Sequence, residues 1–336
     1  MAVESLTVDR TEEKASLGRI QASVRERLDA VTDNMVAAVS HEAPLVAQIG
    51  RHLMGMRGKM FRPTLVLLCS SVEDASEPQA ITLGAAVELI HLATLVHDDA
   101  VDHSVLRRGM PTINSLFSHQ ISVIMGDFLY STALTSLVTL GDLDALRALT
   151  RASTEMTVGE MRQLAVQDAL SFGEDDYYAL IGSKTASLIS AACEIGSLAG
   201  ARQHRKALAE YGTALGMAFQ IADDLIDYTE QEETTGKPAG LDLKEHKVTL
   251  PLIAALKAMS AGQRQRVDAL FATSEPADAD VKDVIGIVTE NGGLQYARER
   301  GALFAQQARE ALVNLPDTVA RRALIESISY VMERHA

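Results

Sequence analysis

Most of this chain consists of residues that favour α-helices, and this feature constrains its fold more than any other. The 336 residues include only 8 prolines and 22 glycines, and the segments between them are rich in Ala, Leu, Glu, Gln and Arg. Alternating runs of Val, Ile and Thr bounded by turn residues, which would predict strands, are scarce. The sequence therefore predicts an all-α protein.

The predicted helices follow one another along almost the whole chain. They span residues 12–40, 60–73, 78–102, 120–141, 143–170, 175–198, 204–230, 249–259, 279–290, 292–313 and 316–333. Segments 120–141 and 185–200 are apolar on most of their circumference, which predicts helices buried by neighbours all round. Because no Pro/Gly/Ser-rich linker divides the chain, residues 1–336 are expected to form a single domain, with the first ten or so residues flexible.

The composition argues against several classes of protein. A net charge of -14 and a pI near 5.1 would repel nucleic acid. Cys69 and Cys193 lie far apart without metal-ligand spacing, which favours neither a disulfide framework nor a zinc site. The opening residues lack the pattern of a signal peptide, and the longest uncharged apolar run, 128–141, is shorter than the roughly 20 residues of a membrane-spanning helix. A soluble, cytoplasmic protein is expected.

Two acidic clusters follow strongly apolar segments, in "LVHDDAVDHSVLRRG" at 95–109 and "FQIADDLIDYTE" at 219–230. Their members are Asp98, Asp99 and Asp102, then Asp223, Asp224 and Asp227. On an ideal helix each triplet falls within an arc of about 100°. Like charges about 4 Å apart repel by roughly 1 kcal/mol even in water. A single cluster of this kind is more simply a solvated acidic face, but two copies predict a site for a hard cation such as Mg²⁺.

Basic residues surround these clusters in the sequence. They are Arg107 and Arg108 directly after the first cluster, with Lys59, Arg62, Lys184, Lys237 and Lys247 elsewhere. Taken singly, each would be an ordinary surface cation. In an acidic chain with metal-type carboxylates, together they predict phosphate recognition. Neither "GMRGKMF" nor "TTGKPAG" has the spacing of a nucleotide-binding P-loop.

His91 is expected to line the same cavity as the first cluster. Seven residues before Asp98, it points to within about 20° of the same direction on an ideal helix. The alternative is a satisfied core histidine. His97 is equally ambiguous, and nothing indicates a histidine-based metal site.

Several recognisable motifs follow one another along the chain. In order, they are "GKMFRP", "ELIHLATLVHDDAVD", "RRGMPT", "GDFLYS", "SKTASL", "FQIADDLID", "TGKPAGLDL" and "KVTLPL". In these motifs the chain closely resembles the trans-isoprenyl diphosphate synthases, the polyprenyl synthetases, over about residues 45–255, and "ISYVMERHA" resembles the family's usual ending. The resemblance implies a helical bundle of the isoprenoid synthase type around a central cavity. It also implies a homodimer in isoprenoid biosynthesis with three Mg²⁺ ions per active site.

The resemblance also implies a role for each site residue. Asp98, Asp102 and Asp223 would bind Mg²⁺ at the diphosphate of an allylic substrate, supported by Asp99, Asp224 and Asp227. The residues implied at the same diphosphate are Arg107, Lys184 and Lys237, with Lys247 nearby. Those implied at the diphosphate of isopentenyl diphosphate are Lys59, Arg62, His91 and Arg108. Thr185 and Gln220 would line the path of the developing carbocation.

One residue departs from the family pattern. His246 precedes Lys247 at a position where the family commonly has glycine. A side chain there restricts the backbone and affects where Lys247 is placed.

The implied reaction is ionisation, condensation and elimination. Metal ions and cationic side chains stabilise the departing diphosphate, and the double bond of isopentenyl diphosphate attacks the allylic carbocation head-to-tail. A proton then leaves to give an all-trans product. No protein nucleophile is needed.

The length of the product depends on the residues one turn before the first acidic cluster, where bulky side chains stop growth in this family. Here these residues are Ala93 and Thr94, and both are small. Thr94 lies about 40° from Asp98 on the ideal helix, which makes it the better lining residue by geometry. Small residues here favour a C30 to C50 product. Leu134, Leu137 and Val138 are candidates for the cavity floor.

Three other interpretations remain open. The first is a synthase with a shorter product, such as farnesyl or geranylgeranyl diphosphate. The second is a class I terpene cyclase, which the second aspartate cluster disfavours. The third is a non-catalytic partner subunit that binds prenyl diphosphates, although such a subunit would be expected to lack some of these residues. Contact with a membrane is expected only through a long apolar product.

Overall fold

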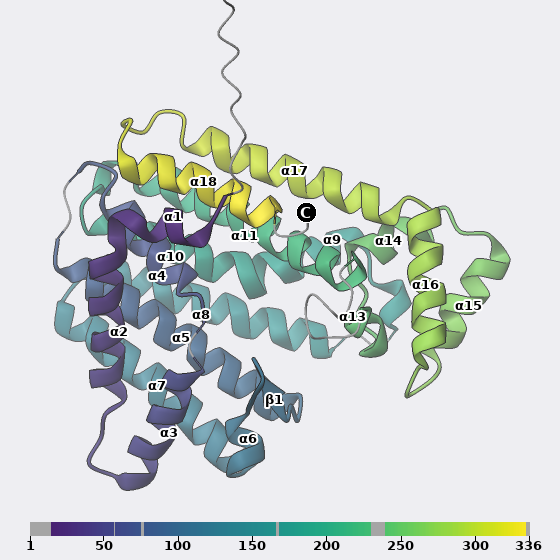
Figure 1. Cartoon of the computed structure of the whole chain (residues 1–336), viewed down its shortest axis with the longest axis horizontal. Helices are drawn as coiled ribbons and strands as arrows, with labels where there is room; N and C mark the ends of the chain where they lie inside the picture. Colours follow the sequence, from purple (N-terminus) through teal and green to yellow (C-terminus); the bar gives the residue numbers. More distant parts are fainter. Residues whose placement is uncertain (1–14, 57, 75–76, 166–167, 230–238, 334–336) are drawn as a thin grey trace, which may run out of the picture.

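The computed structural model describes residues 15–56, 58–74, 77–165, 168–229 and 239–333, which are almost entirely helical (Figure 1). This confirms the predicted all-α class. The described residues contain one small exception that the sequence pattern did not predict. A two-stranded antiparallel hairpin joins β1 (Leu106–Arg107) to β2 (Met110–Pro111), with Leu106 opposite Pro111.

The elements of the first half of the chain run from α1 to α8. They are α1 (Leu17–Gln21), the 3₁₀ turn η1 (Ala22–Val24), α2 (Arg25–Val39), α3 (Pro44–Gly55), α4 (Phe61–Ser70), α5 (Gln79–Val101), α6 (Ile113–Leu116), α7 (His119–Leu140) and α8 (Leu143–Leu164). The predicted helix 12–40 is thus broken within the described residues, and α3 lies in a stretch without a predicted helix. Pro44 starts α3 at a position where a missing N–H costs nothing.

The second half runs from η2 to α18. It contains η2 (Ala169–Ser171), α9 (Glu174–Ile181), the π-helical turn η3 (Gly182–Ala186), α10 (Ser187–Leu198), η4 (Arg202–His204), α11 (Arg205–Thr229), α13 (Leu241–Lys244), α14 (Leu250–Leu256), α15 (Ala261–Phe271), α16 (Asp278–Glu290), α17 (Gly293–Ala311) and α18 (Val319–Glu333). The unpredicted α15 is largely polar and is started by a capping box between Ser260 and Gln263. The predicted helix 143–170 ends early, at Leu164.

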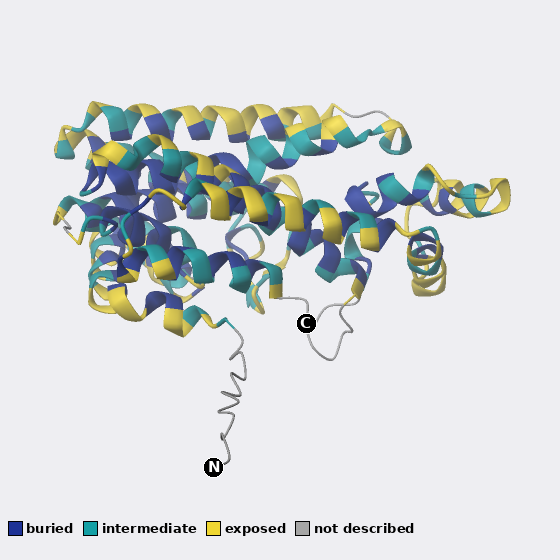
Figure 2. Ribbon diagram, turned by 90° about the horizontal axis from the view of Figure 1, so that it is seen from above, coloured by how far each residue is buried: buried dark blue, intermediate teal, exposed yellow. Residues whose placement is uncertain are grey.

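Most residues of α5 and α10 are buried, so these two helices form the centre of the hydrophobic core. Figure 2 shows buried residues on the inner sides of the packed helices and exposed residues on the outer sides. The predicted burial of segment 185–200 is therefore confirmed. For segment 120–141 the prediction is wrong, because α7 exposes Ile124 at 66% and Val138 at 65% of their surfaces. A second apolar cluster lies between α9, α11, α14 and α16. Since α11 contributes residues to both clusters, it runs through the molecule from one to the other.

Two described helices are long and apolar enough to cross a membrane by length and hydropathy alone. These are α5, with 67% of its most apolar window buried, and α7, with 33% buried. The two helices pack against each other along their length. A core helix surrounded by other helices needs the same apolar composition as a membrane-spanning one.

Candidate active site

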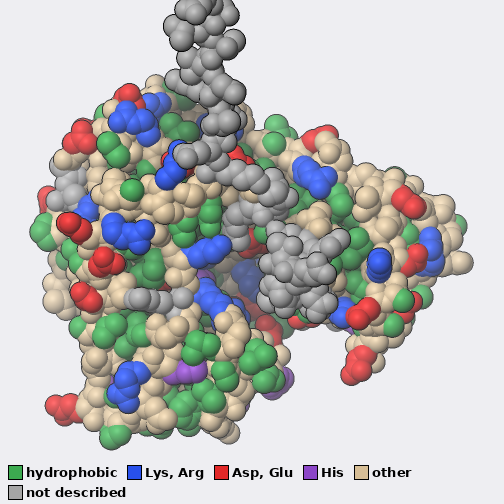
Figure 3. Space-filling model, viewed as in Figure 1, with side chains coloured by type: hydrophobic (Ala, Val, Ile, Leu, Met, Phe, Trp, Pro, Cys, Tyr) green, Lys and Arg blue, Asp and Glu red, His purple; other side chains and the backbone are tan. Residues whose placement is uncertain are grey.

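The two acidic clusters lie at the carboxyl-terminal ends of α5 and α11. The two helix ends lie near each other. The charges of Asp102, at the end of α5, and of Asp242, beside the end of α11, both raise the pKa of Lys247. The face in Figure 3 is hollowed near its centre, and Lys and Arg side chains gather around the hollow. The predicted convergence of acids and cations is therefore present in the structure.

In the first cluster, the protein holds one carboxylate and leaves two for ligands. Asp99 is buried and accepts a hydrogen bond from Arg107 Nε at 2.8 Å. Asp98 and Asp102 accept no side-chain hydrogen bond from any residue that the structure describes. Burial raises the pKa of Asp98 to about 6, and the nearby Glu160 and Asp102 add to the shift while Lys184 opposes it. Negative charge is thus concentrated here without a full counter-charge.

In the second cluster, the protein holds two carboxylates by hydrogen bonds. Asp224 is buried and accepts hydrogen bonds from the hydroxyl of Tyr177 at 2.5 Å and from Gln220 Nε2 at 2.8 Å. Burial raises its pKa to about 8. Asp227 accepts the backbone N–H groups of residues 241 and 242, at 3.0 and 3.1 Å, and so fixes the start of α13. The charge of Asp223 opposes the lowering of the Arg62 pKa and adds to the raising of the Asp242 pKa, so Asp223 lies near both of these side chains.

The donor set fits a hard divalent cation. Among the described residues, no group of three or more His, Cys, Asp or Glu side chains is arranged to hold a metal ion unaided. Mg²⁺ typically takes one or two carboxylates and completes its shell with phosphate oxygens and water. Paired acids from two helix ends suit that coordination. Burial, together with the nearby Glu160 and Asp102, raises the pKa of Asp98, and a bound cation would stabilise its charged form.

Asp242 is an acidic residue of the site that is absent from the sequence-based prediction. Burial and the neighbouring Asp227 raise its pKa to about 6, and it lines the same cavity as Lys247. Its position inside the motif "TGKPAGLDL" was the available signal. Glu160 is also absent from the prediction, and it pairs with Lys184 at 2.6 Å.

The π-helical turn η3 presents two of the predicted residues. Lys184 Nζ lies 2.6 Å from Glu160 and donates to Gln163 Oε1 at 3.2 Å, while Thr185 Oγ1 donates to Gln220 Oε1 at 2.7 Å. A π-helical turn inserts an extra residue and often marks a functional site. These residues line a cavity of about 450 Å³ together with Asp224 and Lys247.

Lys247 follows a residue in a left-handed conformation. His246 has φ 56°, which glycine adopts far more readily than histidine, so the expected restriction is real. The His246 ring contacts Phe271 and its Nε2 lies 3.0 Å from the carbonyl of Thr273. Burial works to lower the pKa of Lys247, but the adjoining carboxylates, foremost Glu245 at 2.6 Å, raise it overall. Lys237 lies outside the described residues.

A second set of cations gathers between α4, α5 and the hairpin. Arg108 Nη1 donates to the carbonyl of Met56 at 2.9 Å. Arg62 Nε and Glu88 Oε2 are buried and have no hydrogen-bond partner among the described residues. Burial lowers the pKa of Arg62 and raises that of Glu88. Burial, reinforced by the arginines, lowers the pKa of His91 well below its ordinary value, so His91 is neutral.

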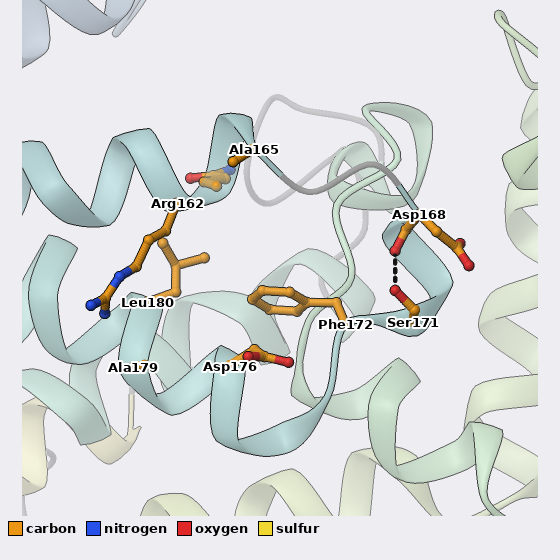
Figure 4. A pocket seen from close by; sticks show the side chains of 9 residues that line it. Arg162, Ala165, Asp168, Ser171, Phe172, Asp176, Ala179 and Leu180 are labelled. Carbon is orange, nitrogen blue, oxygen red and sulfur yellow. Dashed lines mark hydrogen bonds between the residues drawn. The ribbon is translucent and has the colours of Figure 1, made fainter.

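A cavity of about 680 Å³ lies beyond the end of α8 and contains none of the predicted site residues (Figure 4). Arg162, Leu180 and Phe172 line it, and the hydroxyl of Ser171 donates to the carbonyl of Asp168 beside it. It adjoins the cavity that Lys184 and Thr185 line, because Gln163, Phe172 and Leu180 border both cavities.

The residues predicted to control product length differ in burial. Ala93 is buried, and half-buried Thr94 donates its hydroxyl to the carbonyl of His91 at 2.7 Å. Leu134 packs against the core and Leu137 belongs to it. Val138 points to the surface, so its prediction as a floor residue is wrong for this chain.

An all-α bundle with two aspartate clusters and two groups of cations around one hollow has the components of an enzyme that binds diphosphates through divalent metal ions. Residues 43–288 match the sequence model of the family described as Polyprenyl synthetase. The chain belongs to the polyprenyl synthetase family.

Individual relatives agree with this assignment. An all-trans-nonaprenyl-diphosphate synthase (geranyl-diphosphate specific) of Rhodobacter capsulatus is 36% identical over 317 residues, covering 94% of this chain and 97% of that protein. A decaprenyl diphosphate synthase structure from Rhodobacter capsulatus superposes with TM-score 0.89 at 34% identity, covering 96% of this chain and 100% of the other. The predicted prenyltransferase class and isoprenoid synthase fold are confirmed.

A further solved structure bears on the ligands. The polyprenyl synthase of Caulobacter crescentus CB15, complexed with calcium and isoprenyl diphosphate, superposes with TM-score 0.90 at 32% identity, covering 96% of this chain and 99% of the other. A divalent cation and a prenyl-type diphosphate thus bind to a protein of this fold.

Proposed function

We propose that this protein is a Mg²⁺-dependent trans-polyprenyl diphosphate synthase that adds isopentenyl diphosphate repeatedly to an allylic prenyl diphosphate. One observation carries the proposal. Each aspartate cluster lies near a group of basic side chains, since Asp98 interacts with Lys184 and Arg107 and Asp223 interacts with Arg62, beside Arg108. Two diphosphates are the ligands that such an arrangement suits.

The residues that would hold Mg²⁺ are Asp98, Asp102 and Asp223, supported by Asp99, Asp224 and Asp227. Three ions per site is the number that the family resemblance implies. When bound, the metal supplies the positive charge that makes the allylic diphosphate a good leaving group. The hydrogen bonds that occupy Asp99 and Asp224 favour a supporting role for these two.

The protein's own residues orient the reactants. Lys184, Arg107 and Lys247 would hold the allylic diphosphate and balance its charge as the C–O bond breaks. The Thr185 hydroxyl, aligned by its bond to Gln220, directs its oxygen dipole to the path of the carbocation.

The second diphosphate would be held by Arg62, Arg108 and Lys59, with His91 as a neutral hydrogen-bond donor. Binding at these residues places the double bond of isopentenyl diphosphate beside the allylic carbon. The proton eliminated after condensation is accepted by the released diphosphate.

A medium or long product, C30 to C50, is proposed from the small side chains of Ala93 and Thr94. Ala93→Tyr should shorten the product, because a bulky side chain one turn before the first acidic cluster would block the growing chain. The test is incubation of purified protein with labelled isopentenyl diphosphate, Mg²⁺ and separate C10, C15 or C20 starters, with products resolved by length. A ladder that ends between C30 and C50 supports the proposal, whereas a stop at C15 or C20 supports the shorter-chain alternative.

The same assay separates the rival functions. A terpene cyclase would release a hydrocarbon or alcohol without incorporating isopentenyl diphosphate. A non-catalytic partner subunit would bind prenyl diphosphates with no turnover. Either result would contradict the proposal.

We also propose a cytoplasmic homodimer that binds no nucleic acid and touches a membrane only through its apolar product. The exposed apolar side of α7 supports the dimer, because Ile124 and Val138 point to the same side, about 40° apart on the helix. Light scattering tests this oligomeric state directly.

A further inference from the structure

The ammonium group of Lys59 has a different kind of partner from that of Lys184. Lys184 pairs with a carboxylate, Glu160, at 2.6 Å. Lys59 Nζ instead donates to the hydroxyl of Tyr330 at 3.3 Å, and no carboxylate within the described part of the chain forms an ion pair with it. A neutral partner orients the ammonium without cancelling its charge. The whole charge therefore remains for an anionic ligand.

The backbone that carries Lys59 is fixed from α1. Gln21, which is buried, donates from Nε2 to the carbonyl of Lys59 at 2.9 Å and to Thr64 Oγ1 at 3.0 Å. The hydroxyl of Thr64 in turn donates to the carbonyl of Met60 at 2.7 Å, and Met60 is left-handed with φ 55°. The side chain of Lys59 thus begins at a well-defined point. Its tip is what requires a further anchor.

Tyr330 is placed by an aromatic contact to α4, which is in turn stacked on α11. Its ring lies 6.1 Å from the ring of Phe61 on α4, and Phe61 stacks on Phe219 of α11 at 6.0 Å with an interplanar angle of 23°. Lys59 Nζ lies 5.9 Å from the centre of the Tyr330 ring. These contacts join α18 to the two helices that carry Arg62 and the second acidic cluster.

Polar contacts anchor α18 itself. The hydroxyl of Tyr211 donates to the carbonyl of Leu324 at 3.0 Å and lies 2.5 Å from the hydroxyl of Ser327, all buried. Arg19 of α1 pairs with Glu326 at 2.9 Å. Because α18 is held on two sides, Tyr330 provides a fixed position for the tip of Lys59.

We propose that Tyr330 is a positioning residue for isopentenyl diphosphate, since its hydroxyl aims the uncompensated Lys59 ammonium at the substrate's diphosphate. This inference rests on the proposed function and makes α18 part of the binding site of one substrate only. Tyr330 acts through Lys59 and does not itself contact reacting atoms.

The first test is Tyr330→Phe, which removes the hydroxyl and keeps the ring against Phe61. We expect the KM for isopentenyl diphosphate to rise roughly fivefold, because one hydrogen bond to a charged group is lost. The kcat, the KM for the allylic starter and the thermal unfolding midpoint should stay at the wild-type values. Titration calorimetry with isopentenyl diphosphate alone should show the same weakening without turnover.

A double-mutant cycle distinguishes positioning from packing. In the Lys59→Ala background, Tyr330→Phe should have no further effect on binding of isopentenyl diphosphate. The matched control is Tyr296→Phe on α17, which removes a hydroxyl that donates to Glu174 at 2.6 Å. This change should leave the KM values for isopentenyl diphosphate and for the allylic starter unchanged.

The two proposals fail in different ways. The positioning role alone is overturned if the wild type turns over and Tyr330→Phe leaves the KM for isopentenyl diphosphate unchanged. The same holds if the effect of Tyr330→Phe persists in the Lys59→Ala background, or if it is equally large on the KM for the allylic starter. A wild-type protein that neither binds nor incorporates isopentenyl diphosphate overturns the proposed function and this inference with it.

Discussion

Single residues of the acidic clusters divide into those that the protein occupies and those that it leaves for ligands. Asp99 and Asp224 are buried and hydrogen bonded, whereas Asp98 is not bonded in this way within the described chain. Burying a carboxylate without a full counter-charge destabilises the ligand-free protein. A cation bound at such a site would remove this unfavourable free energy. Asp98 should therefore matter to activity far more than to folding, and Asp223 shares its proposed role in holding the metal.

Asp98→Ala and Asp223→Ala should each lower kcat at least about 100-fold, because charge stabilisation of the leaving diphosphate is lost. For Asp98→Ala, the unfolding midpoint should fall little or even rise, because a buried carboxylate without a hydrogen bond is removed. Steady-state turnover and thermal unfolding measure the two effects. Asp29→Ala, an exposed acid on α2, is the control and should be neutral. Near-normal turnover by either site variant would contradict the metal-binding role.

His91 should remain neutral across the physiological pH range. Burial and three arginines lower its pKa in the folded state, so the unfolded chain takes up a proton near pH 6.5 while the folded chain does not. The folded state is therefore stabilised relative to the unfolded chain above pH 6.5. This stabilisation is lost as the pH falls below 6.5, because protonation of His91 then favours the unfolded chain. In NMR spectra, the His91 imidazole should not titrate between pH 8 and 5.5.

The same linkage is measurable as stability. Between pH 7.5 and 5.5, wild type should lose about 1 kcal/mol of unfolding free energy relative to His91→Gln, measured with urea in metal-free buffer. An imidazole midpoint inside this range, or parallel pH profiles for the two proteins, would show that His91 is charged at its site.

The sequence identifies the six aspartates because each cluster has helical spacing after an apolar run. The division of labour among them is invisible in the sequence, since Asp224 is held by Tyr177, 47 positions earlier in the chain. Such a contact depends on how α9 packs on α11. For the same reason Glu160 could not be assigned to the site before the helices were placed, whereas Asp242 stands in the recognised motif "TGKPAGLDL" and was overlooked.

At the scale of elements, the π-helical turn η3 decides where Lys184 and Thr185 point. The helical pattern predicted an unbroken helix over 175–198, because an inserted residue leaves no clear mark on hydrophobic periodicity. The backbone of α11 approaches η3 closely at Gly216, and this contact fixes the position of the turn. A Cβ at Gly216 would lie 2.5 Å from the Cα of Ala186 in η3.

Gly216→Ala should therefore separate α11 from η3 and disturb the bond between Thr185 and Gln220. We expect a loss of about 1–3 kcal/mol of stability, as for overpacked cores, together with a raised KM for the allylic starter. Thermal unfolding and starter kinetics are the measurements.

The control for this variant is Gly262→Ala on α15, where a Cβ meets nothing within 4 Å. Helix propensity predicts that this change is neutral or stabilising by up to about 1 kcal/mol. If Gly216→Ala behaves like the control, the close approach of the two helices does not position the site.

At the scale of the whole molecule, the sequence predicted the helical class and the burial of α10 but misjudged α7. Apolar residues on all sides of a helix predict that other protein surfaces cover it. The periodicity does not show whether those surfaces belong to the same chain or to a second chain. In the structure α7 packs on α5 with one side and leaves Ile124 and Val138 exposed on the other. Leu143 and Met161 of α8 are exposed as well.

The proposed dimer explains this exposure, and it can be tested by placing charge on α7. The double variant Ile124→Glu/Val138→Glu should convert a dimer into a monomer at micromolar concentration, because two buried, unpaired carboxylates would cost several kcal/mol at an interface. Light scattering gives the mass. Leu303→Glu/Val319→Glu changes two other exposed apolar residues, on α17 and α18, and should leave the dimer intact.

The outcome also decides whether the acidic surface of this chain matters to assembly. With a formal net charge of -14, two copies repel each other through their summed field, so an apolar contact must overcome that repulsion. Added salt should therefore strengthen a wild-type dimer that forms through α7, and it should not restore the double glutamate variant, whose loss lies in desolvation. A monomeric wild type at every salt concentration would leave the apolar side of α7 without a partner copy and would contradict the homodimer.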